Sequence, residues 1–469
     1  MRCFFGLAVA WALSVAPLVG CSDATVGGGN GGMGGMPECA SAKDCGDSEE
    51  CTERTCIDGV CGSALAANGV ACTADNECVV GTCTGGTCES TNVADEAACA
   101  GDAGRCQQGS CKVACTEQGI RDAVATGGGG YTFDCDGLTT VVTKAEIAID
   151  KDVILDGEGK LTIDAECIIG LCRRHRAFSV AKAVRAELRG FTVTGAQRVS
   201  PHDPWSPGSI HNEGTLVLTT STVSGNEMAG INNTGGTLTV LDSILSDNDG
   251  YGATSSGTLT LTNSTVSGNY LDAVHNDGGS LTVSDSTLSG NRLSGIINIR
   301  GMATITNTTV SGNDGGIASP GSVLRIASST ISGTPWTVFG NTVGDGRGSF
   351  VEIYASVIDG PCDQPDDDPV TWTSNGYNVK TGGGHTCGIG GPETDQLVVT
   401  ADLNLGPLAD NGGPTMTLAL LPGSVAIDVI PEVDCVDLDG APLTTDQRGQ
   451  PRPETGGSMC DVGASEVQP

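Results

Sequence analysis

The stretch GTLTLTNSTVSGNYLDAVHNDGG, residues 257–279, decides the fold of this chain because its pattern returns at a nearly constant interval. Its core, STVSGN, recurs with small changes from residue 221 to residue 334, in steps of 22, 21, 22, 22 and 21 residues. Each period holds three short runs of alternating apolar and hydroxylated residues, separated by Gly, Asn and Asp. Such runs predict strands rather than helices, and a fixed period of this length predicts a stacked repeat architecture.

A period of about 22 residues excludes two other repeat folds. It is too short for a four-stranded propeller blade, and Ser264 stands where a leucine-rich repeat needs an apolar residue. One coil of a parallel β-helix fits, with each strand paired to its copy on the next coil at roughly 4.8 Å. The repeat resembles the right-handed, pectate-lyase-like β-helix family over about residues 140–360. We therefore predict an all-β chain with a right-handed parallel β-helix solenoid over residues 116–360.

An asparagine closes five of the repeats, and stacking predicts that these side chains form a ladder along the axis. Asn tolerates the left-handed backbone of a turn, and its amide can bond the next copy. The ladder consists of Asn226, Asn248, Asn269, Asn291 and Asn313. A second polar column follows the third run of each coil and consists of Asn212, Asn233, Ser255, Asn276, Asn298 and Ser319. Both columns have a structural explanation, so we expect no catalytic residue in them.

The position after the asparagine ladder is variable and faces outward. Tyr270 occupies it on one coil, and Arg292 and Asp314 occupy it on the next two, where they are placed to pair. This stripe is interpreted either as a sugar-binding strip or as a solvated face. His211 and His275 are equivalent residues on coils three apart, roughly 14 Å, which is too far for a shared metal or a proton relay. We expect both histidines to be exposed turn residues.

Three insertions interrupt the repeats, and each contains one of the tryptophans that follow the leader. These are Trp205, Trp336 and Trp372. Aromatic side chains on loops beside a β-helix can stack on sugars or can shield the solenoid. Together with Tyr270, they are the candidate carbohydrate-binding residues. The acidic run at 366–368 offers oxygen atoms to calcium but lacks the ligand spacing of an EF-hand, so no specific motif supports a metal or a cofactor.

Residues 39–115 contain cysteines in a 27-residue repeat. Two copies, beginning at Cys45 and Cys72, have the spacing Cys-x5-Cys-x4-Cys-x4-Cys, and a less regular third copy runs from Cys99 to Cys115. Few large apolar residues lie between them, so crosslinks must hold these units together. Zinc is the alternative, but no Cys-x2-Cys knuckle occurs here, and an exported chain favours disulfides. The spacing resembles the Dickkopf-like cysteine-rich modules of myxobacterial surface proteins, which assigns no function.

Parity and proximity suggest three further disulfides outside this region. The pairs are Cys167 with Cys172, Cys362 with Cys387, and Cys435 with Cys460.

The N-terminus is typical of an export signal. An apolar run too short for a permanent membrane helix ends in Leu18-Val19-Gly20-Cys21, which resembles the bacterial lipobox. The resemblance implies that residues 1–20 are removed and that Cys21 carries lipid; ordinary secretory cleavage nearby is the alternative. Residues 21–38 are rich in glycine and predict a flexible tether. We expect a protein anchored at the bacterial outer membrane or cell surface, with a periplasm-facing orientation left open.

The C-terminal part, residues 361–469, is predicted to be rich in loops and carries three long motifs. PLADNGGPTMTLALLPGSVAID (407–428), TDQRGQPRP (445–453) and CDVGASE (460–466) together resemble the choice-of-anchor Q domain of bacterial surface proteins. This resemblance implies a β-helix joined to an envelope anchor and assigns no catalytic residue. The expected ion-pair set of this region is Asp446, Arg448, Arg452 and Glu466.

The net charge of −33 excludes a nucleic-acid partner, because polyphosphate binding needs a basic surface. Our leading hypothesis is a lipid-anchored envelope protein that presents a β-helix rod for binding or adhesion, with polysaccharide or another cell-surface component as the candidate partner. The alternative is a polysaccharide lyase or glycoside hydrolase on the same fold. A lyase needs a base beside its substrate and a hydrolase needs two facing carboxylates. The regular coils show neither arrangement, so we assign no catalytic residue and expect that the protein is not an enzyme.

Overall fold

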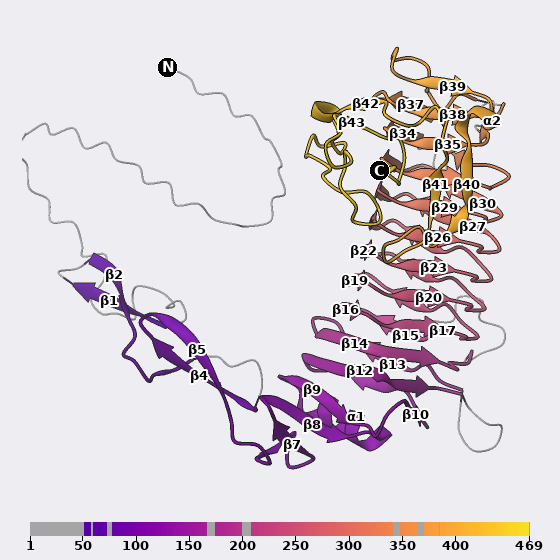
Figure 1. Cartoon of the computed structure of the whole chain (residues 1–469). Coiled ribbons are helices and arrows are strands. Elements are labelled where there is room, and N and C mark those ends of the chain that lie inside the picture. Colours follow the sequence, from indigo (N-terminus) through magenta and orange to yellow (C-terminus); the bar gives the residue numbers. More distant parts are fainter. Residues whose placement is uncertain are drawn as a thin grey trace, which may run out of the picture.

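The computed structural model describes residues 51–57, 60–72, 77–166, 174–198, 208–340, 348–363, 370–383 and 385–468. Its largest part is a right-handed parallel β-helix, which confirms the predicted fold class (Figure 1). The signal segment, the tether and four predicted site residues lie outside the described residues: Cys21, Cys167, Cys172 and Trp205. The acidic run at 366–368 lies outside them as well.

Three parallel sheets run along the β-helix, because each coil contributes one strand to each sheet. The first sheet contains the N-terminal halves of β12 (Val153–Asp164) and β14 (Arg185–Thr194), then β16 (Thr215–Thr219), β19 (Thr237–Leu241), β22 (Thr258–Thr262), β25 (Ser280–Ser284), β28 (Met302–Thr306), β31 (Val323–Ala327), β34 (Ser349–Tyr354) and β37 (Val370–Ser374). The second sheet contains β10 (Thr139–Val142), the C-terminal halves of β12 and β14, then β17 (Thr222–Ser224), β20 (Ile244–Ser246), β23 (Thr265–Ser267), β26 (Thr287–Ser289), β29 (Thr309–Ser311), β32 (Thr330–Ser332), β35 (Val357–Asp359), β38 (Val379–Thr381) and β39 (Gln396–Val398). The third sheet contains β11 (Ile147–Ile149), β13 (Phe178–Val180), β15 (Ile210–Asn212), β18 (Ile231–Asn233), β21 (Ala253–Ser255), β24 (Val274–Asp277), β27 (Ser294–Ile299), β30 (Gly315–Ala318), β33 (Val338–Phe339) and β36 (Cys362–Asp363).

The interior of the β-helix is a continuous stack of aliphatic side chains. Leu259 on β22 pairs in register with Leu281 on β25, and Val266 on β23 pairs with Leu288 on β26. All four are almost completely buried, because alternation along a strand points every second residue inward. Each coil therefore buries its apolar face only between two neighbouring coils, as in other solenoids.

The asparagine ladder lies in the turns after the second sheet, the second column lies on the strands of the third sheet, and both are joined by hydrogen bonds. In the ladder, Nδ2 of Asn248 donates to Oδ1 of Asn269 at 2.9 Å, and Nδ2 of Asn269 donates to Oδ1 of Asn291 at the same distance. The links from Asn226 and to Asn313 are both 2.8 Å. In the second column, Asn212 donates to Asn233 at 2.7 Å. These buried amides satisfy one another along the axis, so repetition of Asn stabilises the stack.

The N-terminal end of the β-helix is closed by α1 (Glu117–Thr126). Thr116 caps this helix by accepting a hydrogen bond from Gly119, and Ile120, Ala123 and Val124 pack beneath it against the first coil. Strand β9 (Gly130–Asp134) follows α1 and pairs with the first-sheet half of β12. The apolar end of the solenoid is thereby removed from water.

The β-helix continues beyond residue 360, where the sequence places its end. Strands β37, β38 and β39 pair in parallel with the coil before them, so the boundary of the solenoid lies near residue 398. The prediction ended early because inserted residues lengthen one coil: Val357 pairs with Thr330, 27 positions earlier. The interval of 21 or 22 residues and the asparagine signal are both lost there.

After β39, the chain turns back and lies along the second sheet (Figure 1). This C-terminal segment, residues 404–467, contains β40 (Leu405–Ala409), β41 (Thr417–Leu420), β42 (Ile430–Pro431), the 3-10 helix η2 (Glu432–Asp434) and β43 (Met459–Cys460), and is preceded by α2 (Thr400–Leu403). It buries the outer faces of β26, β29 and β32, whereas those of β17, β20 and β23 are partly open. The predicted ion-pair set forms: Arg448 contacts Asp446 at 2.6 Å and Arg452 contacts Glu466 at 3.3 Å.

The cysteine-rich region is an extended row of hairpins that leads into the base of the β-helix (Figure 1). Its strands are β1 (Thr52–Ile57), β2 (Val60–Leu65), β3 (Ala71–Cys72), β4 (Val79–Thr84), β5 (Thr87–Asn92), β6 (Ala98–Cys99), β7 (Gly104–Gln107) and β8 (Ser110–Ala114). Its disulfides include Cys51–Cys83, Cys72–Cys88, Cys78–Cys106, Cys99–Cys111 and Cys115–Cys135. Cys115 therefore joins the two ends of the α1 segment rather than closing the third cysteine copy.

Candidate functional site

The candidate site lies on the turns that join the second sheet to the third on five successive coils. We call this surface the turn face and define it as residues 249–252, 270–273, 292–293, 314 and 335–336. Each turn is fixed to the coil before it: the backbone N–H of Tyr270 donates to the carbonyl of Asn248, and that of Arg292 donates to the carbonyl of Asn269, both at 2.9 Å. The side chains of the turn face therefore follow one another at the spacing of the coils.

Asp272 and His275 form a polar pair at the edge of the turn face. The carboxylate of Asp272 is only 5% exposed. Its Oδ1 accepts from the backbone N–H of Ser294 at 2.8 Å, and its Oδ2 lies 3.3 Å from Nδ1 of His275. On β24, Val274 and Asn276 point inward, so the ring of His275 is on the outer side of the strand. With a proton on Nδ1, the ring is held by Asp272 and presents Nε2 outward as a base.

Tyr251, from the preceding coil, completes this cluster. Its ring centroid lies 4.9 Å from that of His275, with the two rings tilted by 47°. Burial raises the pKa of Tyr251, and the neighbouring carboxylate of Asp272 raises it further. The phenol therefore stays protonated at neutral pH and can donate a hydrogen bond. A carboxylate, an imidazole and a phenol are all groups that can take part in general acid–base chemistry.

The prediction that His275 is an exposed turn residue was wrong: it lies on β24 with its side chain only 15% exposed, and its ring is tilted against that of Tyr251. His211 likewise lies on a strand, β15, with a side chain that is 18% exposed. Aligning the repeats paired His275 with His211, three coils away, but did not identify Asp272 and Tyr251 as its neighbours. The available signals were an Asp three residues before the His and a Tyr in the turn one coil earlier.

Next to this cluster, Tyr270 and Arg292 form a stacked pair. The guanidinium carbon of Arg292 lies 4.3 Å from the ring centroid of Tyr270, a cation–π geometry, and Tyr270 is 49% exposed. Among the described ion pairs none joins Arg292 to Asp314, so the sequence-based expectation for this pair was wrong. Arg292 instead turns back to the coil before it and holds the tyrosine ring at the surface.

Trp336 lies further along the same face, on the coil that continues into β33. It is 37% exposed, and its ring centroid is 5.9 Å from that of Phe339. A side chain at Gly315 would meet it, because an added Cβ would lie 2.8 Å from Cη2 of Trp336. The glycine thus leaves room for the indole against the coil below. Tyr270 and Trp336 are three coils apart, roughly 14 Å along the axis.

The other predicted site residues do not join the turn face. Trp372 on β37 pairs in register with the buried Val351, faces the interior and packs against the core near Gly388. The predicted cysteine pairs of the C-terminal part form disulfides, Cys362–Cys387 and Cys435–Cys460. Two sets of three cysteine sulfur atoms in the described residues are close enough to share a metal, but all six cysteines are engaged in disulfides.

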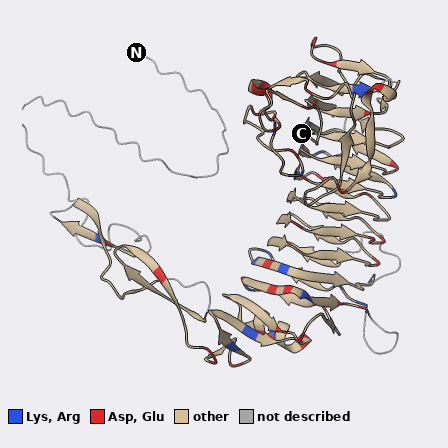
Figure 2. Ribbon diagram, viewed as in Figure 1, with Lys and Arg blue, Asp and Glu red and all other residues tan. Residues whose placement is uncertain are grey.

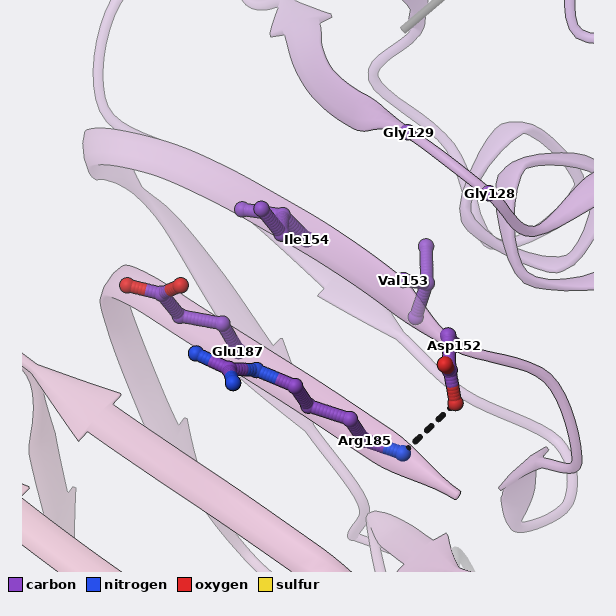
Figure 3. A pocket seen from close by; sticks show the side chains of 7 residues that line it. All are labelled: Gly128, Gly129, Asp152, Val153, Ile154, Arg185 and Glu187. Carbon is purple, nitrogen blue, oxygen red and sulfur yellow. Dashed lines mark hydrogen bonds between the residues drawn. The ribbon is translucent and has the colours of Figure 1, made fainter. Parts of the chain in front are cut away.

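A cavity of about 160 Å³ opens beside the first coils, on the first sheet (Figure 3). Its lining consists of Gly128, Gly129, Asp152, Val153, Ile154, Arg185 and Glu187. Inside it, Oδ1 of Asp152 accepts a hydrogen bond from the backbone N–H of Arg185 at 2.7 Å, and Glu187 is paired with Arg189. Asp152 and Glu187 are thus engaged within the protein, and the lining includes no histidine or aromatic side chain, so the cavity offers less to a sugar than the turn face does.

A second cavity, of about 430 Å³, lies where the cysteine-rich region meets the β-helix. Its walls carry Lys112 and Asp134, which pair at 3.5 Å, together with Glu96, Asp102 and Arg105. These charges of both signs lie at a junction between two parts of the chain and include no histidine or exposed aromatic residue.

The sequence matches no protein-family model and no curated protein. Among solved structures, it is similar to pectate lyase Pel9A, with a TM-score of 0.43, 14% identity, and coverage of 73% of this chain and 90% of that chain. It is also similar to the A-module of the Azotobacter vinelandii mannuronan C-5 epimerase AlgE6, with a TM-score of 0.39, 15% identity, and coverage of 60% and 92%. The chain is a parallel β-helix preceded by a disulfide-rich N-terminal region. The likeness concerns the fold, and no activity is transferred from it.

Proposed function

We propose that this protein belongs to the bacterial envelope and that its β-helix binds a polysaccharide along the turn face. The observation that carries the proposal is the row of half-exposed aromatic rings, Tyr270 and Trp336, which the coil spacing aligns with the axis of the rod. Rings presented in this way can stack on the apolar faces of sugars. Since the chain carries a net charge of −33, a neutral polysaccharide is the expected ligand.

The placement in the envelope is supported by sequence motifs. Leu18–Cys21 resembles a lipobox, and the motifs at 407–428, 445–453 and 460–466 resemble the choice-of-anchor Q domain. Within the described part of the chain, no helix combines the length and hydropathy needed to span a bilayer. Lipid on Cys21 would therefore hold the protein at the membrane, and a Cys21→Ser variant should leave the membrane fraction.

The test is a polysaccharide array probed with the whole chain lacking its leader. Tyr270→Ala and Trp336→Ala should each weaken binding about tenfold, because each removes one stacking surface. Phe350→Ala is the matched control, since Phe350 is an exposed aromatic residue of β34 on the first sheet, away from the turn face. Binding to no polysaccharide, or equal losses in all three variants, would overturn the proposal.

A second candidate function, a polysaccharide lyase, is favoured by the Asp272, His275 and Tyr251 cluster. His275 would remove the proton next to a sugar carboxylate while the bond to the leaving oxygen breaks, and Tyr251 would protonate that oxygen. The same array answers this question when the products are analysed. Release of unsaturated oligosaccharides from an acidic polysaccharide, lost in His275→Gln while binding remains, would establish the lyase in place of a binding protein.

A further inference from the structure

The disulfides of the cysteine-rich region follow a rule that their spacing does not show. Two bridges close single copies on themselves, Cys72–Cys88 and Cys99–Cys111. Two other bridges connect one copy to the next, Cys51–Cys83 and Cys78–Cys106. The second and third copies are therefore closed internally and are also linked to a neighbour.

The bridges between copies shorten the covalent path through the region. From Cys51 the path crosses to Cys83, runs back over five residues to Cys78, and crosses to Cys106. This path bypasses both of the bridges that close single copies. Under tension, a chain is held by its shortest covalent connection, so the bridges between copies carry the load.

The same path enters the β-helix through a third bridge. From Cys106 it runs nine residues to Cys115 and crosses to Cys135, beyond α1. Only fourteen residues of backbone then lie on a path whose ends, Cys51 and Cys135, are 84 positions apart in sequence. At about 3.5 Å per extended residue, fourteen residues span about 50 Å, whereas 84 would span about 290 Å.

Both bridges between copies are buried. Cys51, Cys83, Cys78 and Cys106 are all buried, as are Cys99 and Cys111, whereas the bridges Cys72–Cys88 and Cys115–Cys135 are partly exposed. Beyond the bridges, β8 pairs in parallel with β9, and β9 pairs with β12. The third cysteine copy is thus continuous with the first sheet, and force passes from it into a hydrogen-bonded ladder.

We infer that the cysteine-rich region is a load-bearing stalk whose length under tension is limited by the disulfides between its copies. A protein held at one end and attached to a ligand at the other is stretched along this line. When tension separates the hairpins, the disulfides limit how far the β-helix can move away from Cys51, because covalent bonds set the length of the path from Cys51 to Cys135. This inference does not depend on the ligand that the β-helix binds.

Single-molecule stretching of the whole chain between Glu53 and Leu138 tests the stalk. Both residues are exposed and can be replaced by clickable unnatural amino acids that carry the handles. The oxidised path between them contains two residues before Cys51, fourteen along the bridged route and three after Cys135. These nineteen residues predict a full extension of about 65 Å, against about 300 Å for the 85 residues of the reduced chain.

Two double variants separate load-bearing bridges from the others. In Cys51→Ala with Cys83→Ala, the shortest path grows from nineteen to 37 residues, so the extension should increase by about 60 Å. In Cys72→Ala with Cys88→Ala, the path is unchanged, so the extension should stay the same.

Misfolding of a variant does not obscure this result, because the length at full extension depends on covalent connections alone. Mass-spectrometric disulfide mapping of the same samples establishes which bonds are present. The inference is overturned if the two double variants extend equally, if the oxidised protein extends as far as the reduced one, or if the map lacks the bridges between copies. None of these outcomes involves a polysaccharide, so the proposed function stands or fails separately.

Discussion

At the scale of single residues, Asn269 shows how one side chain fastens three coils together. Its Nδ2 donates to Asn291 on the next coil and to the carbonyl of Leu245 at 3.1 Å. Its Oδ1 accepts from both the backbone and the side chain of Asn248. We predict that Asn269→Ala lowers the free energy of unfolding by about 3 kcal/mol, since several buried donors and acceptors lose their partners. Urea denaturation followed by circular dichroism measures the change.

Asn232→Ala is the control for this prediction. Asn232 lies on the outer side of β18, and among the described residues its amide hydrogen-bonds with His211 and Thr234 at the surface. The same chemical change there should alter the free energy of unfolding by no more than about 0.5 kcal/mol. Equal effects at the two positions would show that the ladder does not stabilise the coils.

The ladder was predictable, whereas the cluster around His275 was not, and the reason is the same in both cases. A residue that repeats at the coil interval meets its own copies, so Asn226 to Asn313 can be stacked from the sequence alone. Asp272 reaches His275 because of the local shape of one turn, and Tyr251 reaches it from a turn that differs from its neighbours. Such contacts within and between irregular turns are not encoded in the period.

At the scale of elements, the covering of the second sheet by the C-terminal segment escapes prediction for a related reason. Thr265 on β23 and Thr287 on β26 are equivalent residues in nearly identical repeats, yet only Thr287 is completely buried. Its hydroxyl donates to the carbonyl of Met416, 129 residues away. The repeat pattern therefore predicts the strands but cannot show which of their outer faces a distant segment covers.

Gln447 connects the C-terminal segment to two strands of the second sheet. Its Nε2 lies 2.9 Å from the hydroxyl of Thr287 on β26, and its Oε1 accepts from that of Thr309 on β29 at 2.6 Å. The amide is 1% exposed and also contacts Thr415 at 2.9 Å. This explains physically why a glutamine occurs inside the motif TDQRGQPRP: it accepts from the buried hydroxyl of Thr309 and donates to those of Thr287 and Thr415, which themselves donate to the carbonyls of Met416 and Asp285.

We predict that Gln447→Ala loosens the C-terminal segment without unfolding the β-helix. Hydrogen exchange should accelerate at least tenfold in β41 and in residues 444–450, because three buried hydroxyls lose hydrogen bonds. Exchange in β17, β20 and β23 should not change, since the segment does not cover them. Gln450→Ala, a change of the same type at a half-exposed position, is the control. Uniform acceleration over all coils would contradict this division into a scaffold and a docked segment.

At the scale of the whole molecule, charge is unevenly distributed. Figure 2 shows acidic and basic residues together on β12 and β14, while the strands from β16 to β26 carry few charges. The C-terminal segment, in contrast, buries a charged cluster where it meets the β-helix: Arg452, Glu466, Asp446 and Asp461 are all almost fully buried. The free energy of unfolding should therefore depend on the protonation of this cluster.

The direction of that dependence follows from Glu466. Burial raises the pKa of Glu466 to about 7, an effect that outweighs the opposing influence of Arg452 at 3.3 Å. Burial also raises the pKa of Asp461, so both carboxyls act in the same direction. Because the folded chain holds the proton of Glu466 more tightly than the unfolded chain does, its contribution to stability is fully present below about pH 4.5 and is lost as the pH rises through about 7.

We predict that the unfolding free energy of the wild type decreases between pH 5 and pH 8 relative to that of Glu466→Gln, by on the order of 2 kcal/mol. The glutamine cannot ionise, yet it retains an oxygen that can accept from the backbone N–H of Asp461, as Glu466 does at 3.0 Å. Glu432→Gln, at an exposed position of the same segment, should keep the pH dependence of the wild type. Parallel curves for the wild type and Glu466→Gln would show that this carboxyl is already ionised in the folded protein. If the two curves diverge, the buried cluster is the part of the molecule that couples pH to the free energy of unfolding, because the C-terminal segment buries Glu466 against the β-helix.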